Sequence, residues 1–416
     1  MKQNFAEKIS NKLPTRVLRL VENAGKTSSS LGYGLYLVGG IVRDLISGRP
    51  NLDIDLMVEG DAIHMAKVIS KEAGGKPTIH IKFGTVTFKL GEYRIDLATC
   101  RSETYSRPGA LPDVKPGDIS ADLFRRDFTI NAMAICVNPD RFGELIDLYG
   151  GVHDLEAGII RVLHDRSFQD DATRIMRAVR YEQRLNFKLE GHTEKLLRRD
   201  LGMLDTISGD RLRHEVMLWL SEPQPEGIIK RAARLGILSG LHPALSWVPH
   251  SGRAFRAARK GCSASYLTHL YLALFLYNLD KKQLEQLLRR LNIQGGELYD
   301  VTSQTLSLKN KLGTLDDAII QPSEIYLKLK GFNTLAIRAN ALCAASRQVR
   351  KNLELYLDKL RLIKTRLNGK DLAEMGVPEG RQVGIVLERL LTAKLDGEVR
   401  TKADEESLVR QLVRAL

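Results

Sequence analysis

Two neighbouring runs of sequence decide the fold: Leu37-Val-Gly-Gly-Ile-Val-Arg-Asp44 and, shortly after it, Gly48-Arg-Pro-Asn-Leu-Asp-Ile-Asp55. In the first run an apolar strand ends at a glycine pair, and a helix is expected to begin directly after it. Glycines at such a junction let backbone N–H groups approach a ligand, and the positive end of the new helix points to the same place. We therefore predict that Gly39 and Gly40 contact phosphate groups, although a plain tight turn is the alternative for a glycine pair alone.

The second run places two carboxylates on one face of a strand. Asp53 and Asp55 are two residues apart and point the same way, whereas Ile54 and Leu56 point into the core. Two like charges held this close are costly unless cations neutralise them, and oxygen ligands favour Mg²⁺. A bare D-x-D is more often a solvated edge strand, but the upstream glycine pair favours a site in which Asp53 and Asp55 hold catalytic metal ions.

A third carboxylate, Asp96, occurs in Tyr93-Arg-Ile-Asp-Leu-Ala98, where its apolar neighbours are expected to face inward. It either completes the metal cluster or pairs with Arg94 or another basic residue. The sequence leaves both interpretations open.

Hydrophobic periodicity divides the chain into a mixed N-terminal part and a helical remainder. The first part has predicted strands at Leu35–Val38, Asp53–Val58, Phe83–Leu90 and Tyr93–Ala98, with a helix at Ala62–Lys71. From about Asp154 onward only helices are expected, among them Ala172–Leu185, Arg211–Leu220, Lys281–Leu291 and Asn352–Leu367. A chain of 416 residues should form several domains, and weak punctuation near residues 221–225 and 331–333 suggests further boundaries.

Composition favours a folded cytoplasmic protein with a polyanionic partner. The 63 Lys and Arg exceed the 50 Asp and Glu, which gives a formal charge of +13 that attracts nucleic acid, although many basic proteins are simply well solvated. The four cysteines are far apart, so neither a disulfide framework nor structural zinc is expected. No signal peptide or membrane span is apparent, and we predict a cytoplasmic location.

Three signatures together resemble the class II tRNA nucleotidyltransferase and bacterial poly(A) polymerase family. The first is the pair of runs quoted above. The second is Arg125-Arg-Asp-Phe-Thr-Ile-Asn-Ala-Met-Ala134, followed by the connector Asp147-Leu-Tyr-Gly-Gly-Val-His-Asp-Leu155. The third is Asp170-Asp-Ala-Thr-Arg174, and the resemblance covers residues 33–187 in the family's order.

The resemblance implies a polymerase-β-like α/β nucleotidyltransferase palm followed by all-α domains. The expected divisions are a palm or head at 1–153, a base-reading neck at 154–220, a body at 221–333 and a tRNA-binding tail at 334–416. It also implies that Asp171 and Arg174 select C or A by hydrogen bonds to the base. The expected nucleotide contacts are Gly40, Arg43, Arg126, Arg177 and Arg180.

The residue types and spacing of the third signature favour binding of a base and an anion, independently of the family resemblance. Asp171 and Arg174 offer an acceptor and a planar donor fork about one turn apart, which suits the edge of a base. On the helix after them, Arg177, Arg180 and Arg184 face away from the apolar side. With no acidic partner expected nearby, these arginines favour an anionic ligand, although an exposed solubilising face is the plain alternative.

Three further parts of the sequence lead to predictions. Residues 102–118 contain three prolines and two glycines and are predicted to form an exposed loop. In the relatives an intact loop at this place accompanies addition of the terminal A. In Ser208-Gly-Asp-Arg-Leu-Arg-His-Glu215, the spacing predicts an ion pair between Arg211 and Glu215. Basic residues farther on are predicted to bind RNA phosphates: Arg347, Arg350, Lys351, Lys359, Arg361, Lys364 and Arg366.

The combined prediction is template-independent addition of C and/or A to the 3′ end of tRNA from CTP and ATP, with Mg²⁺. The alternatives are CC addition alone, an RNA poly(A) polymerase, and a non-catalytic RNA-binding protein on the same scaffold. A metal phosphohydrolase is rejected because the helical half has no further His-Asp doublet with a distant His and Asp to complete a site. A P-loop ATPase is rejected because no GxxxxGK(S/T) loop is present. Neither DNA nor a membrane is an expected partner, and the sequence does not predict the oligomeric state.

Overall fold

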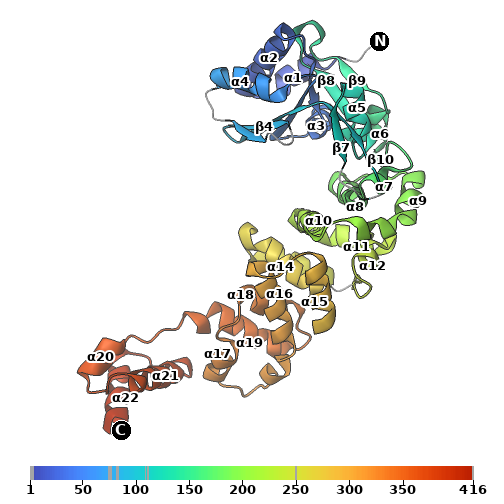
Figure 1. Ribbon diagram of the computed structural model, residues 1–416. Coiled ribbons are helices and arrows are strands. Elements are labelled where there is room, and N and C mark those ends of the chain that lie inside the picture. The colour runs from blue at the N-terminus through green and yellow to red at the C-terminus, as the bar shows by residue number, and fades with distance from the viewer. Residues whose placement is uncertain are drawn as a thin grey trace. The chain divides into compact units, whose positions relative to one another are not determined.

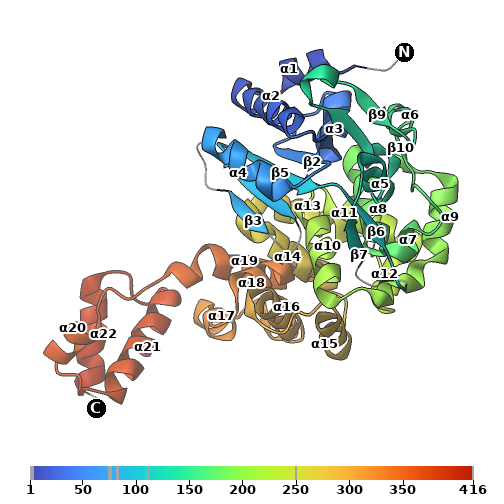
Figure 2. The same ribbon diagram turned by 45° about the horizontal axis from the view of Figure 1, so that its top comes forward.

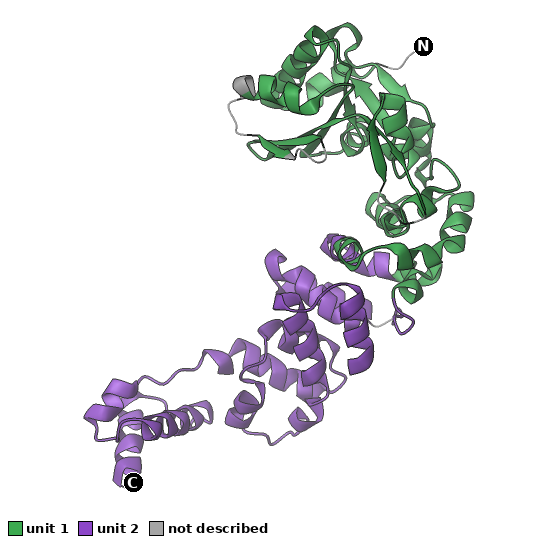
Figure 3. Cartoon of the chain, in the orientation of Figure 1, with its two compact units in different colours: residues 1–215, 230–241 green, residues 216–229, 242–416 purple. Residues whose placement is uncertain are grey.

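The computed structural model describes residues 4–73, 77–80, 84–107, 109, 112–248 and 251–414. The chain divides into two compact units (Figure 3): unit 1 comprises residues 1–215 and 230–241, and unit 2 comprises residues 216–229 and 242–416. The division passes through two helices, α10 (Gly209–Ser221) and α11 (Pro225–Leu235).

A seven-stranded mixed sheet forms the centre of unit 1 (Figure 1), with the strand order β3-β4-β5-β2-β1-β8-β9. Only β2 and β5 are parallel neighbours, and the other neighbouring strands of this sheet are antiparallel. The strands are β1 (Leu35–Val38), β2 (Asp53–Val58), β3 (Thr78–His80), β4 (Thr85–Leu90), β5 (Tyr93–Thr99), β8 (Met133–Cys136) and β9 (Leu145–Asp147). The four predicted strands are confirmed, except that Phe83 lies outside the described residues and the β4 strand begins at Thr85.

Helices pack on this sheet because their apolar faces need a partner. Figures 1 and 2 both show α2 and α4 side by side, and α4 packs against β4 and β5. The helices wholly within unit 1 are α1 (Ala6–Lys12), α2 (Thr15–Ser30), α3 (Gly40–Ser47), α4 (Ala62–Ala73), α5 (Ile119–Phe124), α6 (Gly151–Ala157), α7 (Ser167–Asp170), α8 (Thr173–Leu185), α9 (Gly191–Arg199) and α12 (Ile237–Leu241). Short 3-10 helices occur at Thr129–Asn131, Pro139–Arg141 and Leu201–Thr206.

Two small sheets correct the sequence predictions. The segment expected to be an exposed loop contains β6 (Arg101–Thr104) and β7 (Asp113–Pro116), which pair as an antiparallel hairpin. The prolines and glycines correctly indicate the turn that connects the two strands. They also led to the prediction of a loop for the short strands on either side of that turn, which was wrong. The part expected to be only helical contains β10 (Ile159–Ile160) and β11 (Lys188–Leu189), paired in parallel.

Unit 2 is helical throughout its described residues. Besides its parts of α10 and α11 it contains α13 (Ser251–Gly261), α14 (Ala264–Leu276), α15 (Lys281–Arg290), α16 (Gly296–Lys309), α17 (Pro322–Leu329), α18 (Thr334–Cys343), α19 (Arg347–Asp358), α20 (Gly369–Glu374), α21 (Arg381–Leu395) and α22 (Lys402–Arg414), with 3-10 turns at Leu312–Leu315 and Leu360–Leu362. No helix among the described residues combines the length and apolar character needed to cross a lipid bilayer.

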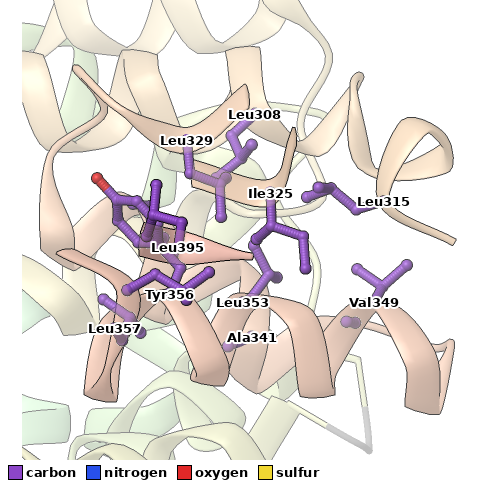
Figure 4. Packing of buried hydrophobic residues seen from close by; sticks show 13 residues of the cluster. Leu308, Leu315, Ile325, Leu329, Ala341, Val349, Leu353, Tyr356, Leu357 and Leu395 are labelled. Carbon is purple, nitrogen blue, oxygen red and sulfur yellow. The ribbon is translucent and has the colours of Figure 1, made fainter. Parts of the chain in front are cut away.

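The main core cluster of unit 2 joins α16 to α19 and the end of α21 (Figure 4). Leu329 and Ile337 belong to this one cluster, although the predicted body and tail boundary falls between them. The division into four domains stays a prediction.

The predicted helix Asn352–Leu367 is wrong in its second half, because α19 ends at Asp358. Leu360 packs into the main cluster, whereas Leu367 packs into a second cluster with Leu372 and Val409. The α-helix therefore ends before the segment that connects the two hydrophobic clusters.

Candidate active site

A cavity of about 810 Å³ lies in unit 1, among residues from the sheet, from α8 and from α10. Every predicted site residue except Arg180 lines it. The structure therefore brings together residues from all three sequence signatures, and the cavity is made entirely by unit 1.

The glycine pair shapes one wall of the cavity. Gly39 has φ 71° and ψ −129°, a conformation that residues with a side chain rarely adopt, and α3 begins at Gly40 directly after it. A Cβ atom at Gly39 would lie 2.9 Å from Nη1 of Arg126 and 4.0 Å from Oδ2 of Asp55. The absence of a side chain thus allows the helix N-terminus, a guanidinium and a strand carboxylate to lie close together.

The two predicted metal ligands lie on β2 as expected. Asp53 is exposed and Asp55 half-buried, while Ile54 and Leu56 between and after them are buried. Burial raises the pKa of Asp55 to about 6; Arg126 opposes this shift, and the neighbouring carboxylates of Asp96 and Asp53 add to it. A carboxylate destabilised by burial and by like charges is stabilised by a bound cation, so the donor set fits a divalent metal.

Asp96 forms the ion pair named in its second interpretation, and its metal role stays a prediction. It lies opposite Asp55 in the parallel register, and it forms an ion pair of 2.9 Å with Arg94 and accepts a hydrogen bond of 2.5 Å from Oγ1 of Thr87. Within the described ranges, no group of three or more His, Cys, Asp or Glu side chains is arranged to hold a metal ion. A metal site here would include the pair Asp53 and Asp55 together with ligand oxygens.

A buried chain of hydrogen bonds connects the three signatures. Arg43 donates to both carboxylate oxygens of Asp44, each at 2.9 Å, and to Oδ1 of Asn131 at 2.7 Å. The amide Nδ2 of Asn131 donates to Asp127 at 3.0 Å, and Asp127 also accepts two bonds from Arg177, at 2.8 and 2.7 Å. Asn131 and Asp127 were not predicted as site residues, although both lie within the second signature.

The arginines of α8 have acidic partners, which contradicts the prediction that their face has none. Arg177 pairs with Asp127 at 2.7 Å, and Glu215 lies 3.9 Å from Arg177 and 4.0 Å from Arg180. The Arg180 side chain is only 8% exposed, so this part of the helix is not a solvated surface. Periodicity reports which residues share a face of one helix, but these partners come from elsewhere in the chain.

The electrostatics of the two acidic partners differ. Burial acts to raise the pKa of Asp127, but the charge of Arg177 and hydrogen bonds from Asn131 and Arg177 outweigh it, and the net pKa is lowered. Burial raises the pKa of Glu215, and Arg180 and Arg177 only partly oppose this. Ile175 and Val179 on the opposite side of α8 are fully buried, as predicted.

The two predicted base readers are held by separate sets of contacts. Asp171 lies between α7 and α8, and its Oδ1 accepts from the backbone N and Oγ1 of Thr173 and from Nη2 of Arg211. Arg174 is buried, and it donates to Oγ of Ser167 at 2.7 Å and to the backbone oxygen of Arg125 at 2.5 Å.

The predicted ion pair between Arg211 and Glu215 is therefore wrong. Arg211 instead pairs with Asp171 at 2.7 Å. The one-turn spacing permits an internal pair in α10, but Glu215 lies among the α8 arginines.

The β6–β7 hairpin reaches the same cavity through Glu103 and Tyr105. The side chain of Glu103 is 6% exposed, forms ion pairs with Arg101 at 2.8 Å and Arg125 at 3.3 Å, and accepts a hydrogen bond from Tyr105 at 2.8 Å. Arg125 also supplies the carbonyl that holds Arg174. The hairpin is thus connected through Arg125 to Arg174, one of the two predicted base readers.

A strand D-x-D pair beside a glycine-led helix, in a cavity of about 810 Å³ lined by arginines and carboxylates, defines the class of the domain as a nucleotidyltransferase fold. Residues 35–161 match the family described as "Poly A polymerase head domain", and residues 186–248 match "Probable RNA and SrmB- binding site of polymerase A". A solved structure of a CCA-adding enzyme in an apo form is 32% identical, with a TM-score of 0.85, and the alignment covers 100% of this chain and 99% of that chain. The chain belongs to the tRNA nucleotidyltransferase and bacterial poly(A) polymerase family.

Two curated relatives are named as A-adding tRNA nucleotidyltransferases. The protein from Geobacter sulfurreducens is 34% identical over 96% of this chain, which spans about half of that protein, 47% of its length. The protein from Halalkalibacterium halodurans is 29% identical over 98% of this chain and 95% of its own length.

Proposed function

We propose that the chain transfers a nucleoside monophosphate from CTP or ATP to the 3′-hydroxyl of tRNA and releases pyrophosphate. The observation that carries the proposal is that one cavity contains both the Asp53 and Asp55 pair and the base-reading pair Asp171 and Arg174. Similar solved structures of CCA-adding enzymes include complexes with ATP, with CTP and with a tRNA. A nucleotide held between a carboxylate pair and a base-reading pair fits this reaction.

The triphosphate is proposed to lie against the glycine pair and Arg126. Backbone N–H groups at the start of α3 and the guanidinium of Arg126 supply positive charge where the phosphates would be bound. Arg43 and Arg177 line the same cavity and are proposed to contact the nucleotide as well. For Arg180, which does not line the cavity, nucleotide contact stays a prediction.

Asp53 and Asp55 are proposed to hold Mg²⁺. Nucleotidyltransferases of this family use divalent metal ions, and Mg²⁺ suits one or two carboxylates combined with substrate phosphates. When bound, the metal supplies charge neutralisation at the phosphates and favours ionisation of the attacking hydroxyl. The rigid β2 strand orients both carboxylates toward one place, and this orientation is the contribution of the protein itself.

Base selection is proposed to follow from complementary hydrogen bonds. The exocyclic amines of C and A are donors, whereas the equivalent positions of G and U are carbonyl acceptors. The carboxylate of Asp171 can accept from an amine but repels a carbonyl oxygen, and Arg174 supplies donors for a ring acceptor. A protein side-chain pair therefore replaces a nucleic-acid template.

The A nucleotide is proposed to be among those added. The two curated relatives named as A-adding above match 96% and 98% of this chain, and the solved CCA-adding enzyme, whose named product also ends in A, covers 100% of it; the first curated relative named as CC-adding covers 46%. The β6–β7 hairpin, present here, lies in the segment whose intact form accompanies A addition in the relatives. We also propose a cytoplasmic location, where such an enzyme meets its tRNA substrates.

The test supplies three tRNA substrates, lacking the 3′ end, ending in C and ending in CC, each with labelled CTP or ATP. Addition of A to the third substrate is the expected minimum, and long poly(A) products on unrelated RNA would contradict the tRNA assignment. Asp53→Ala and Asp55→Ala should abolish transfer while tRNA affinity is retained. Asp140→Ala, an exposed aspartate outside the cavity, is the matched control and should keep wild-type transfer.

A further inference from the structure

The carboxylate of Asp171 is fixed from one side. Its Oδ1 accepts hydrogen bonds from the backbone N of Thr173 at 3.0 Å, from Oγ1 of Thr173 at 2.7 Å and from Nη2 of Arg211 at 2.7 Å. Since a carboxylate offers about four acceptor positions in all, three donors occupy those of Oδ1. Among the described residues no donor to Oδ2 is found, which leaves that oxygen for a ligand.

We propose that Arg211 is a positioning residue for base selection, holding Asp171 so that a single carboxylate oxygen meets the incoming base. The inference rests on the proposed function and extends it to a residue on α10. Asp171 is the residue that touches the nucleotide, and Arg211 acts through it.

A contact from Arg211 in addition to those from Thr173 matters because the carboxylate of Asp171 can rotate about its terminal torsion. The terminal torsion of Asp is broad, so contacts from Thr173 alone allow the carboxylate to tilt and to exchange its two oxygens. The planar guanidinium of Arg211 approaches from another helix and restricts that rotation. A fixed carboxylate repels the carbonyl oxygen of G or U, whereas a mobile one can turn away from it.

On α10, the residue that pairs with Asp171 is Arg211. Glu215, one turn farther along α10, lies near Arg177 and Arg180 instead. Arg211 and Asp171 both line the cavity, and their side chains are 38% and 25% exposed. A pair this accessible to water adds little to folding stability, so its loss should alter selection without unfolding the protein.

The test compares Arg211→Met with Arg213→Met in the full-length protein. Arg213 is a close match, because it lies on the same helix, is 34% exposed and pairs with Asp210 at 2.7 Å, but does not line the cavity. Single-turnover rates are measured on tRNA ending in CC, with each of the four triphosphates in turn. Melting temperatures are measured for both variants.

We expect Arg211→Met to reduce the preference for the accepted triphosphate over GTP and UTP by about tenfold, the effect of one charged hydrogen bond. Arg213→Met should keep the wild-type preference, and Arg211→Lys should restore part of it because the charge is retained. Equal slowing with all four triphosphates, or an unchanged preference, would overturn the positioning role. If the wild-type protein itself adds neither C nor A to any of the tRNAs, it is the proposed function that fails.

Discussion

Substitution of Gly39 by alanine tests whether the glycine pair builds the nucleotide site or merely permits a turn. The new methyl group would lie 2.9 Å from Nη1 of Arg126, on the side that also faces Asp55. It would in addition force an L-residue into φ 71° and ψ −129°. The substitution therefore combines backbone strain with displacement of a guanidinium at the proposed triphosphate position.

Gly48→Ala separates these two effects. Gly48 ends the same helix α3 with φ 71° and ψ 18°, and a Cβ atom there would have no neighbour within 4 Å. The strain is about 1–2 kcal/mol for the left-handed conformation at Gly48 and up to about 3 kcal/mol at Gly39. For a unit of this size, each kcal/mol lowers the melting temperature by about 2–4 °C.

The assay is single-turnover transfer of labelled ATP to tRNA, at a temperature below both melting transitions. We expect Gly39→Ala to slow transfer by about 100-fold, since misplacement of a catalytic site by about 1 Å costs this much. Gly48→Ala should remain within about threefold of the wild type, because its strain lies at the far end of α3 and it displaces no side chain. Wild-type transfer by Gly39→Ala, or equal inactivation by Gly48→Ala, would refute the reasoning.

Three further predictions concern stability and its dependence on pH. Glu405→Gln should cost about 3 kcal/mol in thermal unfolding, because Glu405 is fully buried against Lys394; Glu406→Gln, at a side chain that is 35% exposed, is the control. Burial acts to raise the pKa of Asp127, but the paired Arg177 outweighs it and the pKa is lowered. The ionised Asp127 therefore stabilises the fold above about pH 4, and this stabilisation is lost on acidification. The melting temperature of Asp127→Asn should fall less steeply with acid than that of the wild type. Leu353→Ala should leave a cavity in the unit 2 core (Figure 4) and cost about 3–5 kcal/mol in denaturant unfolding.

The parts of the fold that the sequence predicted are those determined by local alternation. The strand containing Asp53 and Asp55 was predicted with correct bounds, because polar and apolar residues alternate along it. The junction at Gly39 was predicted equally well, since a strand, a glycine pair and a helix follow one another without a gap. In both cases the pattern that indicates the structure lies within a few residues.

The interactions that the sequence did not predict join residues far apart in the chain. Arg211 was assigned to Glu215 because a helical turn separates them, but the packing of α10 beside the turn before α8 gives it Asp171 instead. Asp127 was not predicted to pair with Arg177, since the two residues are 50 positions apart in the chain. Helical periodicity describes a single element and contains no information on which elements become neighbours.

The hydrogen-bond chain through Asn131 gives a physical reason for three separated signatures in one site. Its amide group accepts from Arg43 through oxygen and donates to Asp127 through nitrogen, and Asp127 in turn accepts from Arg177, so the two side chains together link the glycine-led helix to the arginine helix. A carboxylate at this position could not donate to Asp127, and an apolar residue could do neither. The nucleotide site therefore depends on the relative placement of α3 and α8, and this buried amide is a connection between them that requires both a donor and an acceptor.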